Sequence, residues 1–221
     1  MYKRQIPGRS TDTVRFTPFI YGTNANKWEP GAKNPPLYKV MLFTRRDGAY
    51  REYMPLKIGF GKTELVDGRL TRFDKELKLV KAGYNAAADR KTTLAELKAL
   101  KAKGNNTICP DYPQPGWFYD LCDELGLYVI DCANINAPEK RDDRKVGGTP
   151  SNDPSLADEY LERVKAMYYR SRNHSCVIAF ALGGESGNGY NMYKAYEWLK
   201  SVEKSRPVIC ADADGEWNSD L

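Results

Sequence analysis

From about Lys78 onward, short apolar runs alternate with longer amphipathic stretches, and this alternation constrains the fold more than any other feature of the sequence. Leu127-Tyr128-Val129-Ile130 and the uninterrupted apolar run Cys176–Leu182 are predicted as strands buried on both faces. Stretches with apolar residues at helical spacing lie between the apolar runs. Strands that alternate with helices predict βα units built around a parallel sheet.

The helical stretches have start and stop signals. Thr93 and Glu96 form a capping-box pattern, which predicts a helix that starts there and ends at Gly104. Trp117–Leu125 is predicted as a second helix, closed by Gly126.

The remaining elements complete the alternation. Asp153 directly before Pro154 predicts another helix start, because aspartate caps helices and proline suits the first helical position. The other expected elements are strands near Lys78–Ala82, Thr107–Cys109 and Val208–Cys210, and a helix containing Met192, Tyr196, Leu199 and Val202.

Residues up to about Phe60 are predicted as β-structure. Phe16–Tyr21 alternates apolar and polar residues, and Leu37–Phe43 is a second strand candidate. Asp47-Gly48 between two such runs is a hairpin signal. Three or four strands are too few for a closed sandwich, so we expect partner strands upstream of this sequence.

Composition and charge exclude some classes of partner. The net charge of +5 comes from 34 basic and 29 acidic residues that are interspersed, and no basic patch or motif indicates nucleic-acid binding. No apolar run reaches transmembrane length, and the N-terminal residues lack a signal-peptide core. We therefore expect neither nucleic acid nor membrane as a partner.

The cysteines do not predict a metal site. None of the five forms a C-x-x-C pair, and His174 is the only histidine, so a zinc site is not favoured. Cys122, Cys132 and Cys176 lie within apolar runs, where cysteine serves as a small core residue. A structural hydrogen bond is the favoured role for His174.

Periodicity alone also allows an open, doubly wound sheet, which usually has a glycine-rich first turn at its ligand site. Gly83-Tyr84-Asn85 is not such a loop. The stretch Gly183–Gly187 is rich in glycine but lacks the Lys-Ser/Thr ending of a phosphate loop, and Glu185 within it would repel a phosphate.

Several stretches, in order along the chain, resemble glycoside hydrolase family 2 and its β-galactosidases. The family patterns are N-P-x-L-Y, G-F-R-x-x-E, the run before D-E-A-N, R-N-H-P and L-G-N-E-S. The matching stretches are Asn34–Tyr38, Ile58–Glu64, Phe118–Asp131, Arg172–His174 and Leu182–Ser186; Arg206–Val208 and Glu216–Asn218 also fit.

The resemblance implies an α/β fold: a partial TIM (β/α)8 barrel preceded by part of an immunoglobulin-like β-sandwich. The implied domains are residues 1–60, the end of the sandwich, and residues 61–221, the first half of the catalytic barrel. Family resemblance also implies a bacterial protein of the cytoplasm or periplasm. We further expect its true N-terminus to lie upstream.

By resemblance, Glu185 is the general acid/base of a retaining glycosidase that hydrolyses terminal β-linked sugars. It would protonate the leaving oxygen and then activate water. Its position just after Cys176–Leu182 places it at the face of a barrel where active sites lie. Without the resemblance, a glutamate in a glycine-rich turn is usually solvated and inert. Asn85 and Tyr112 match family positions, and Trp217 is a candidate platform for a sugar ring.

Other pocket positions depart from the family pattern. A retaining mechanism needs a second carboxylate about 5 Å from the first, and the family takes it from a later strand. Family motif N-R-H-E is Asn85–Ala88 here, and D-E-A-N is Asp131–Asn134. The asparagine of G-N-E-S, which hydrogen-bonds the 2-hydroxyl of the sugar in the family, is Gly184.

Family members often use Mg²⁺, but Asn136 and Pro138 occupy its ligand positions here, so no cofactor or metal is expected.

Two functional readings remain open. The first is a β-galactosidase-like hydrolase fragment that is inactive as this chain. The second is a non-catalytic carbohydrate-binding or structural relative. Both predict a carbohydrate ligand, and strand edges left free in a half barrel predict self-association.

Overall fold

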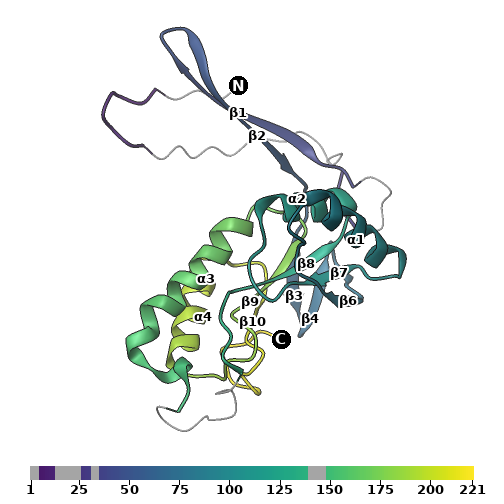
Figure 1. Cartoon of the computed structure of the whole chain (residues 1–221), viewed down its shortest axis with the longest axis vertical. Helices are drawn as coiled ribbons and strands as arrows, with labels where there is room; N and C mark the ends of the chain where they lie inside the picture. Colours follow the sequence, from purple (N-terminus) through teal and green to yellow (C-terminus); the bar gives the residue numbers. More distant parts are fainter. Residues whose placement is uncertain (1–4, 13–25, 31–34, 139–147) are drawn as a thin grey trace.

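The computed structural model describes residues 5–12, 26–30, 35–138 and 148–221, and its main sheet is parallel (Figure 1). The sheet has five strands in the order β10-β9-β8-β7-β6, each paired in parallel with its neighbour. The strands are β6 (Lys81–Gly83), β7 (Thr107–Cys109), β8 (Tyr128–Cys132), β9 (Val177–Ala181) and β10 (Val208–Ile209). The predicted alternation of strands and helices is confirmed.

Four helices connect these strands. They are α1 (Arg90–Ala102), α2 (Gly116–Leu125), α3 (Ala157–Ser171) and α4 (Tyr190–Val202). Figure 1 shows α3 alongside α4, with α1 and α2 at the other end of the sheet. Two short 3-10 helices, η2 (Pro150–Asn152) and η3 (Pro154–Leu156), precede α3.

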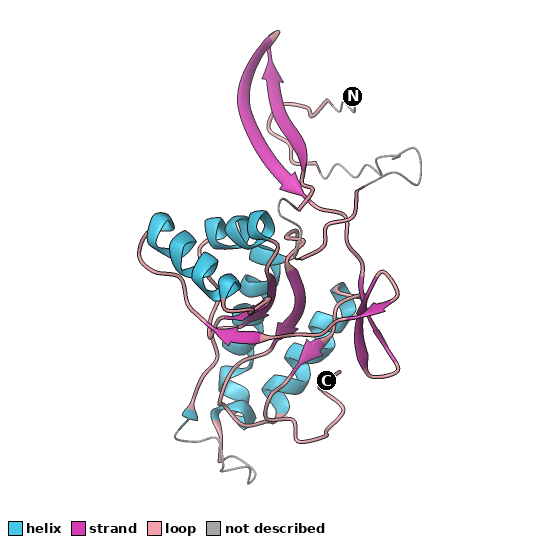
Figure 2. Ribbon diagram, turned by 90° about the vertical axis from the view of Figure 1, so that its right-hand side faces the viewer, coloured by secondary structure: helices cyan, strands magenta, loops and turns pink. Residues whose placement is uncertain are grey.

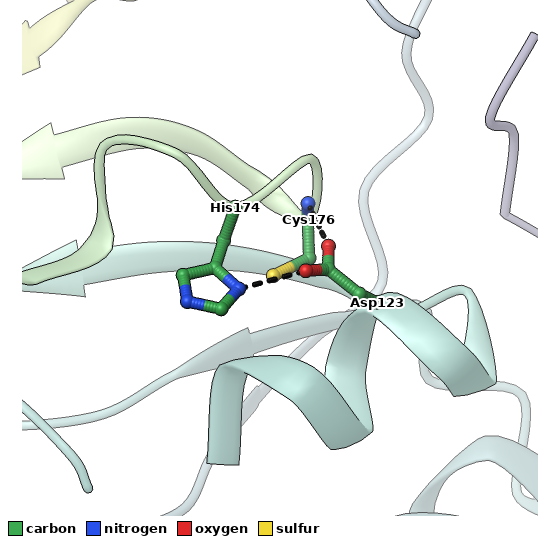
Figure 3. Close-up of side chains that lie close together, drawn as sticks. All are labelled: Asp123, His174 and Cys176. Carbon is green, nitrogen blue, oxygen red and sulfur yellow. Dashed lines mark hydrogen bonds and ion pairs between the residues drawn. The ribbon is translucent and has the colours of Figure 1, made fainter. Parts of the chain in front are cut away.

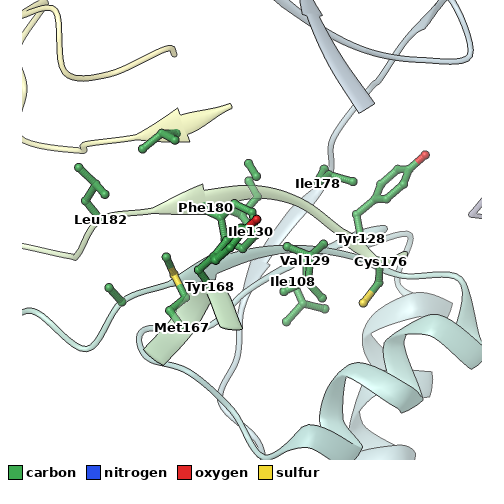
Figure 4. Packing of buried hydrophobic residues seen from close by; sticks show 14 of the residues in the cluster. Ile108, Tyr128, Val129, Ile130, Met167, Tyr168, Cys176, Ile178, Phe180 and Leu182 are labelled. Atoms are coloured by element: carbon green, nitrogen blue, oxygen red, sulfur yellow. The ribbon is translucent and has the colours of Figure 1, made fainter. Parts of the chain in front are cut away.

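The core lies between the sheet and its helices, as Figure 4 shows. Every residue of β8 is buried, and so are the first four of β9, as expected for parallel strands covered on both faces. Phe180 of β9 contacts Tyr168 of α3 edge to face, with ring centroids 5.5 Å apart. Cys122, Cys132 and Cys176 are buried free thiols within this layer, as predicted.

Helix ends agree with the sequence in two cases and differ in one. Gly126 caps α2 in the left-handed conformation (φ 66°), and the Asp153 side chain accepts the Ser155 N–H at the start of η3. The capping box at Thr93 is wrong. The N-cap of α1 is Asp89, whose carboxylate accepts the Thr92 N–H, while Thr93 is fully buried inside the helix.

A long hairpin extends from the body of the molecule (Figures 1 and 2). It consists of β1 (Tyr38–Arg46) and β2 (Ala49–Ile58), paired antiparallel around the predicted Asp47-Gly48 turn. Its large apolar side chains are exposed, for example Met41 and Tyr53. The strand predicted at Phe16–Tyr21 lies outside the described residues, so the sandwich assignment of residues 1–60 stays a prediction.

A second small sheet precedes the barrel strands and was missed from the sequence. It contains β3 (Thr63–Val66), β4 (Arg69–Arg72) and β5 (Lys75–Glu76), all antiparallel. The turn between β3 and β4 is Asp67-Gly68, with positive φ at both residues. It is the same signal that correctly predicted the first hairpin.

Arg72 of β4 is buried in an aromatic surround at the N-terminal end of the main sheet. Its guanidinium lies 4.9 Å from the ring centroid of Trp28 and 5.8 Å from that of Tyr128. Burial lowers its pKa from the usual arginine value. A Cβ atom on Gly61 would lie 1.6 Å from Nη2 of Arg72, so the guanidinium fills the space beside this glycine.

The outer edge of the sheet at β10 is partly paired, although a free strand edge was expected there. The Asp220 N–H donates to the Val208 carbonyl at 2.8 Å, and its carboxylate accepts the Val208 N–H at 2.7 Å. The Cys210 N–H donates to Ser219 Oγ. The expected free edge at β10 is therefore wrong over this stretch, whereas β6 has no second strand partner among the described residues. Self-association stays a prediction. None of the described helices is long and apolar enough to cross a membrane.

Candidate active site

The loops that follow the parallel strands meet at one edge of the sheet, and Glu185 lies in the loop after β9. Its side chain is exposed. The loop after β8 holds its backbone: the Ala137 N–H donates to the Glu185 carbonyl at 2.8 Å, and the Gly184 N–H donates to the Ile135 carbonyl at 2.9 Å. These bonds give Glu185 a defined position at the carboxyl end of β9.

This loop requires glycine at residue 183. A Cβ atom at residue 183 would lie 2.8 Å from the Ile135 carbonyl oxygen, closer than real contacts allow. Gly184 is different, because a Cβ atom there would lie 3.7 Å from Asn136 Nδ2, an ordinary van der Waals distance. A Cβ atom is therefore accommodated at residue 184, and close backbone approach does not explain the absence of the family's asparagine.

Residues far along the chain hold the other end of the loop. Ser151 Oγ donates to the Ser186 carbonyl at 2.7 Å. The N–H groups of Ser186 and Gly187 both donate to Oδ2 of Asp212, in the loop after β10. No local sequence pattern marks Asp212, and the folded arrangement alone identifies it.

Asn85, after β6, bonds to the loop after β7. Its Nδ2 donates to Asp111 Oδ2 at 2.7 Å, and its Oδ1 accepts the Asp111 N–H at 3.0 Å. Gln114, which is 1% exposed, donates to Asn85 Oδ1 and to the Tyr112 carbonyl. The predicted residues Asn85 and Tyr112 therefore meet at Gln114, which sequence reasoning missed. Tyr112 presents a side chain that is 46% exposed.

Trp217 rests on α4. Its ring stacks on Tyr193 with centroids 5.3 Å apart and an interplanar angle of 29°, and it meets Tyr196 edge to face. It is still 56% exposed, so one part of the indole is available to a ligand. Its neighbour Asn218 donates to Asn188, which links Trp217 to the loop that carries Glu185.

Cysteine does not replace a lost carboxylate at this edge. Cys132 stands where the family pattern D-E-A-N has glutamate, and it is 7% exposed. Burial raises the pKa of its thiol to about 12, so the thiol stays protonated near neutral pH. Because the thiolate is the nucleophilic form, we assign Cys132 no catalytic role.

The family's Mg²⁺ does not fit the residues at its ligand positions. Asn136 offers only a neutral amide, and its Nδ2 faces Gly184. Pro138 has no side-chain ligand, and Glu139, a residue that could have substituted, lies outside the described ranges. Mg²⁺ requires several oxygen ligands in near-octahedral geometry, which this donor set lacks.

One cluster of metal-ligand types lies at the opposite end of β9 (Figure 3). His174 Nδ1 lies 2.7 Å from Asp123 Oδ2, and the Cys176 N–H donates to Asp123 Oδ1 at 2.7 Å. Both carboxylate oxygens are thus used within the protein, and burial raises the pKa of the Cys176 thiol well above its usual value. This network joins α2 to the start of β9, which confirms a structural hydrogen bond for His174.

Comparison with known families identifies this scaffold. Residues 84–220 match the family model described as "Glycosyl hydrolases family 2, TIM barrel domain". The chain belongs to glycoside hydrolase family 2. The partial TIM barrel expected from the sequence is therefore confirmed, and β6 to β10 are barrel strands.

Curated relatives of this family 2 chain include two β-galactosidases. That of Vibrio cholerae is 34% identical over 185 residues, and that of Lactococcus lactis subsp. lactis is 36% identical over 190 residues. Each match covers 79% of this chain and 18% of the relative. The chain therefore spans less than a fifth of the length of either enzyme.

Solved structures show the same fold at lower identity. The exo-chitosanase CsxA of Amycolatopsis orientalis has a TM-score of 0.66 at 21% identity, covering 83% of this family 2 chain and 23% of that chain. The β-D-glucuronidase of Dictyoglomus thermophilum has a TM-score of 0.66 at 18% identity, covering 85% and 34%.

Proposed function

We propose that this chain supplies the general acid/base part of a β-galactosidase-type active site that hydrolyses terminal β-linked sugars. The observation that carries the proposal is the position of Glu185. It follows barrel strand β9 in a loop that backbone bonds fix from the β8 side. Active sites of TIM-barrel enzymes lie at this end of the strands, and β-galactosidases are among the curated relatives.

In the proposed mechanism, protonated Glu185 donates its proton to the glycosidic oxygen as the bond to the sugar breaks. The second carboxylate, expected from a later barrel strand, attacks the anomeric carbon and forms a glycosyl-enzyme. Ionised Glu185 then takes a proton from the water that hydrolyses this intermediate. Asn85 and Tyr112 would contact the sugar's hydroxyl groups, and Trp217 would stack on a sugar ring.

The 221-residue chain alone is expected not to hydrolyse aryl β-galactosides. Glu185 can supply a proton, but no other acidic residue of the sequence matches the family's nucleophile. Release of the aryl group, followed by absorbance, measures this directly. Turnover by the purified chain that disappears in Glu185→Gln would contradict the expectation.

Sugar binding tests the proposed site without requiring turnover. The probe is a galactose-configured isofagomine, whose ring nitrogen is cationic, titrated calorimetrically into the purified chain. Glu185→Gln is expected to weaken binding about tenfold or more, because an ion pair with the ring nitrogen is lost. The control Asp214→Asn removes a carboxylate from an exposed position at the same edge.

The outcomes separate the two candidate functions. Binding that depends on Glu185 but not on Asp214 supports the active-site proposal. Sugar binding that is unaffected by Glu185→Gln favours the non-catalytic carbohydrate-binding alternative. Failure of the chain to bind the probe would contradict both sugar-binding proposals and would leave a structural relative of the family.

The charge of the edge predicts discrimination against acidic sugars. The described loops at this edge contain seven acidic residues and no lysine or arginine: Asp89, Asp111, Asp153, Glu185, Asp212, Asp214 and Glu216. Asp220 lies beside the start of β10 instead, where it forms an ion pair with Lys200. Residues 139–147 contain four basic and three acidic residues, and Arg163 and Arg170 of α3 donate to the carbonyls of Asn134 and Gln114. The sum of these charges is still negative. An anionic uronic acid is therefore repelled where a neutral galactoside is not.

We expect the galactose-configured probe to bind about tenfold more tightly than its uronic acid counterpart at low salt. The difference should shrink as salt is added, because salt screens exposed charges. Calorimetry at two ionic strengths measures both effects. Equal affinities at low salt would show that the edge charge does not act on the ligand.

A further inference from the structure

Two consecutive backbone N–H groups directly after Glu185 point at a single carboxylate oxygen. Ser186 N–H donates to Asp212 Oδ2 at 2.9 Å, and Gly187 N–H donates to the same oxygen at 2.8 Å. Asp212 is 4% exposed, and Ser186 is fully buried. These are charge-assisted hydrogen bonds in a site from which water is largely excluded, so they are among the stronger contacts of the edge.

The backbone conformation suits this contact. Gly187 has φ of +69°, in the left-handed region, where glycine pays no steric penalty. Turns of this kind bring successive N–H groups to one concave side, which is a common way to bind an anion. In this protein the anion comes from the chain itself, from the loop after the next barrel strand.

A short turn presents the Asp212 side chain. The Ala213 N–H donates to the Cys210 carbonyl at 3.1 Å, and the Glu216 N–H donates to the Ala213 carbonyl at 3.0 Å. Cys210 follows β10 directly. Asp212 is therefore anchored to the barrel wall three residues after the end of β10.

We propose that Asp212 is the positioning residue of Glu185. The inference rests on the proposed role of Glu185 and adds the group that sets its place. Contacts to the loop after β8 fix the backbone at Gly184 and Glu185, and Asp212 fixes it at Ser186 and Gly187. Glu185 is thereby held on both sides, by loops from the two strands that flank β9.

Positioning at this level matters for a proton donor. A catalytic group misplaced by about 1 Å loses on the order of 100-fold in rate. Loops at barrel ends are mobile unless other contacts restrain them. Without the Asp212 acceptor, the restraint on this side falls to the bond from Ser151 Oγ to the Ser186 carbonyl, which loosens the segment that carries the Glu185 carboxyl group.

Two substitutions separate hydrogen bonding from charge. Both N–H groups use the same oxygen, so Asp212→Asn can retain both bonds through its amide oxygen while losing the negative charge. Asp212→Ala loses both bonds. Asp214→Asn, in the same loop and exposed, is the control, because asparagine tolerates the positive φ of this position.

Amide hydrogen exchange on the purified chain is the first readout, and it needs neither ligand nor turnover. In Asp212→Ala we expect exchange at Ser186 and Gly187 to accelerate about tenfold or more, with β8 and β9 unchanged. Asp212→Asn and Asp214→Asn should stay within about threefold of the parent chain. Unchanged exchange in Asp212→Ala would overturn the proposal, as would equal acceleration in Asp212→Asn.

Binding of the galactose-configured isofagomine is the second readout. Asp212→Ala is expected to weaken it about as much as Glu185→Gln does, and the double variant no further, because both changes act through one carboxylate. Asp212→Asn should restore binding. If exchange responds as expected but no variant alters probe binding, Asp212 orders the loop and the proposed role of Glu185 fails. If Glu185→Gln weakens binding and Asp212→Ala does not, the positioning proposal fails alone.

Discussion

Asp123→Ala is expected to lower the free energy of unfolding by about 3–5 kcal/mol, the usual cost of removing one partner from a buried charged network. Asp123 is 2% exposed, and its carboxylate accepts hydrogen bonds from both the Cys176 N–H and the His174 ring. Alanine leaves these two groups without an acceptor in a site that water does not reach. Urea denaturation followed by tryptophan fluorescence measures the change.

Glu124→Ala provides the matched control on the same helix. Glu124 forms ion pairs with Lys57 and Arg90, and all three side chains are partly exposed. Exposed pairs contribute about 0–1 kcal/mol, so this substitution should have little effect. If the two alanine variants unfold at the same urea concentration, the Asp123 network contributes no more than a surface pair.

Asp131→Asn is expected to raise the free energy of unfolding at neutral pH and so to stabilise the protein. Asp131 is fully buried, and burial raises its pKa from 3.8 to about 6, although Tyr119 and the Cys132 N–H donate to Oδ1. A carboxyl whose pKa is higher in the folded state holds its proton more tightly there. Stability is therefore lost as the pH rises from about 4 to about 6.

The size of this loss follows from the pKa difference and is about 3 kcal/mol above pH 7. Asparagine keeps an oxygen for Tyr119 and for the Cys132 N–H but carries no charge. Its new N–H groups need an acceptor; Ser171 Oγ, which donates its own hydrogen to the Met167 carbonyl, is one candidate. We expect a net gain of about 1–3 kcal/mol at pH 7.5.

Urea denaturation of both proteins at a series of pH values between 4 and 8 provides the measurement. The difference in unfolding free energy between Asp131→Asn and the parent chain should grow from pH 4 to pH 6 and then stay constant. A difference that does not vary with pH would show that Asp131 does not titrate in this range in the folded protein.

Local patterns predicted the barrel elements well. Thr107–Cys109 is a strand with the predicted bounds, and the helix ending at Gly126 differs by one residue. Both are marked by local sequence signals: a compact apolar run in the strand and a glycine directly after the helix. These signals depend only on residues adjacent in the sequence, so they can be recognised without knowledge of the tertiary structure.

The start of α1 shows where such signals compete. Thr93 and Glu96 fit a capping box, yet Asp89 caps the helix and Thr93 is buried against the core. The pattern describes hydrogen-bonding capacity, whereas packing decides which residue faces inward. Burial of Thr93 is a tertiary effect that the spacing alone does not contain.

The site shows a different limit. Glu185, Asn85 and Tyr112 were found because they match family motifs, and their roles remain proposals. Asp212 and Gln114 hold these loops but lie 25 or more residues from some of their partners. Contacts between loops of separate strands leave no periodic trace, so only the folded arrangement identifies them.

Gly61 and Arg72 have a consequence for comparing this protein with its relatives one alignment column at a time. The G-F-R pattern becomes Gly59-Phe60-Gly61 here, which reads as the loss of an arginine. In the folded chain a guanidinium from β4 lies where a side chain at residue 61 would begin, against Trp28. The two positions are therefore sterically coupled: a side chain at residue 61 would collide with Arg72, and a small residue at position 72 beside Gly61 would leave a space next to Trp28 unfilled.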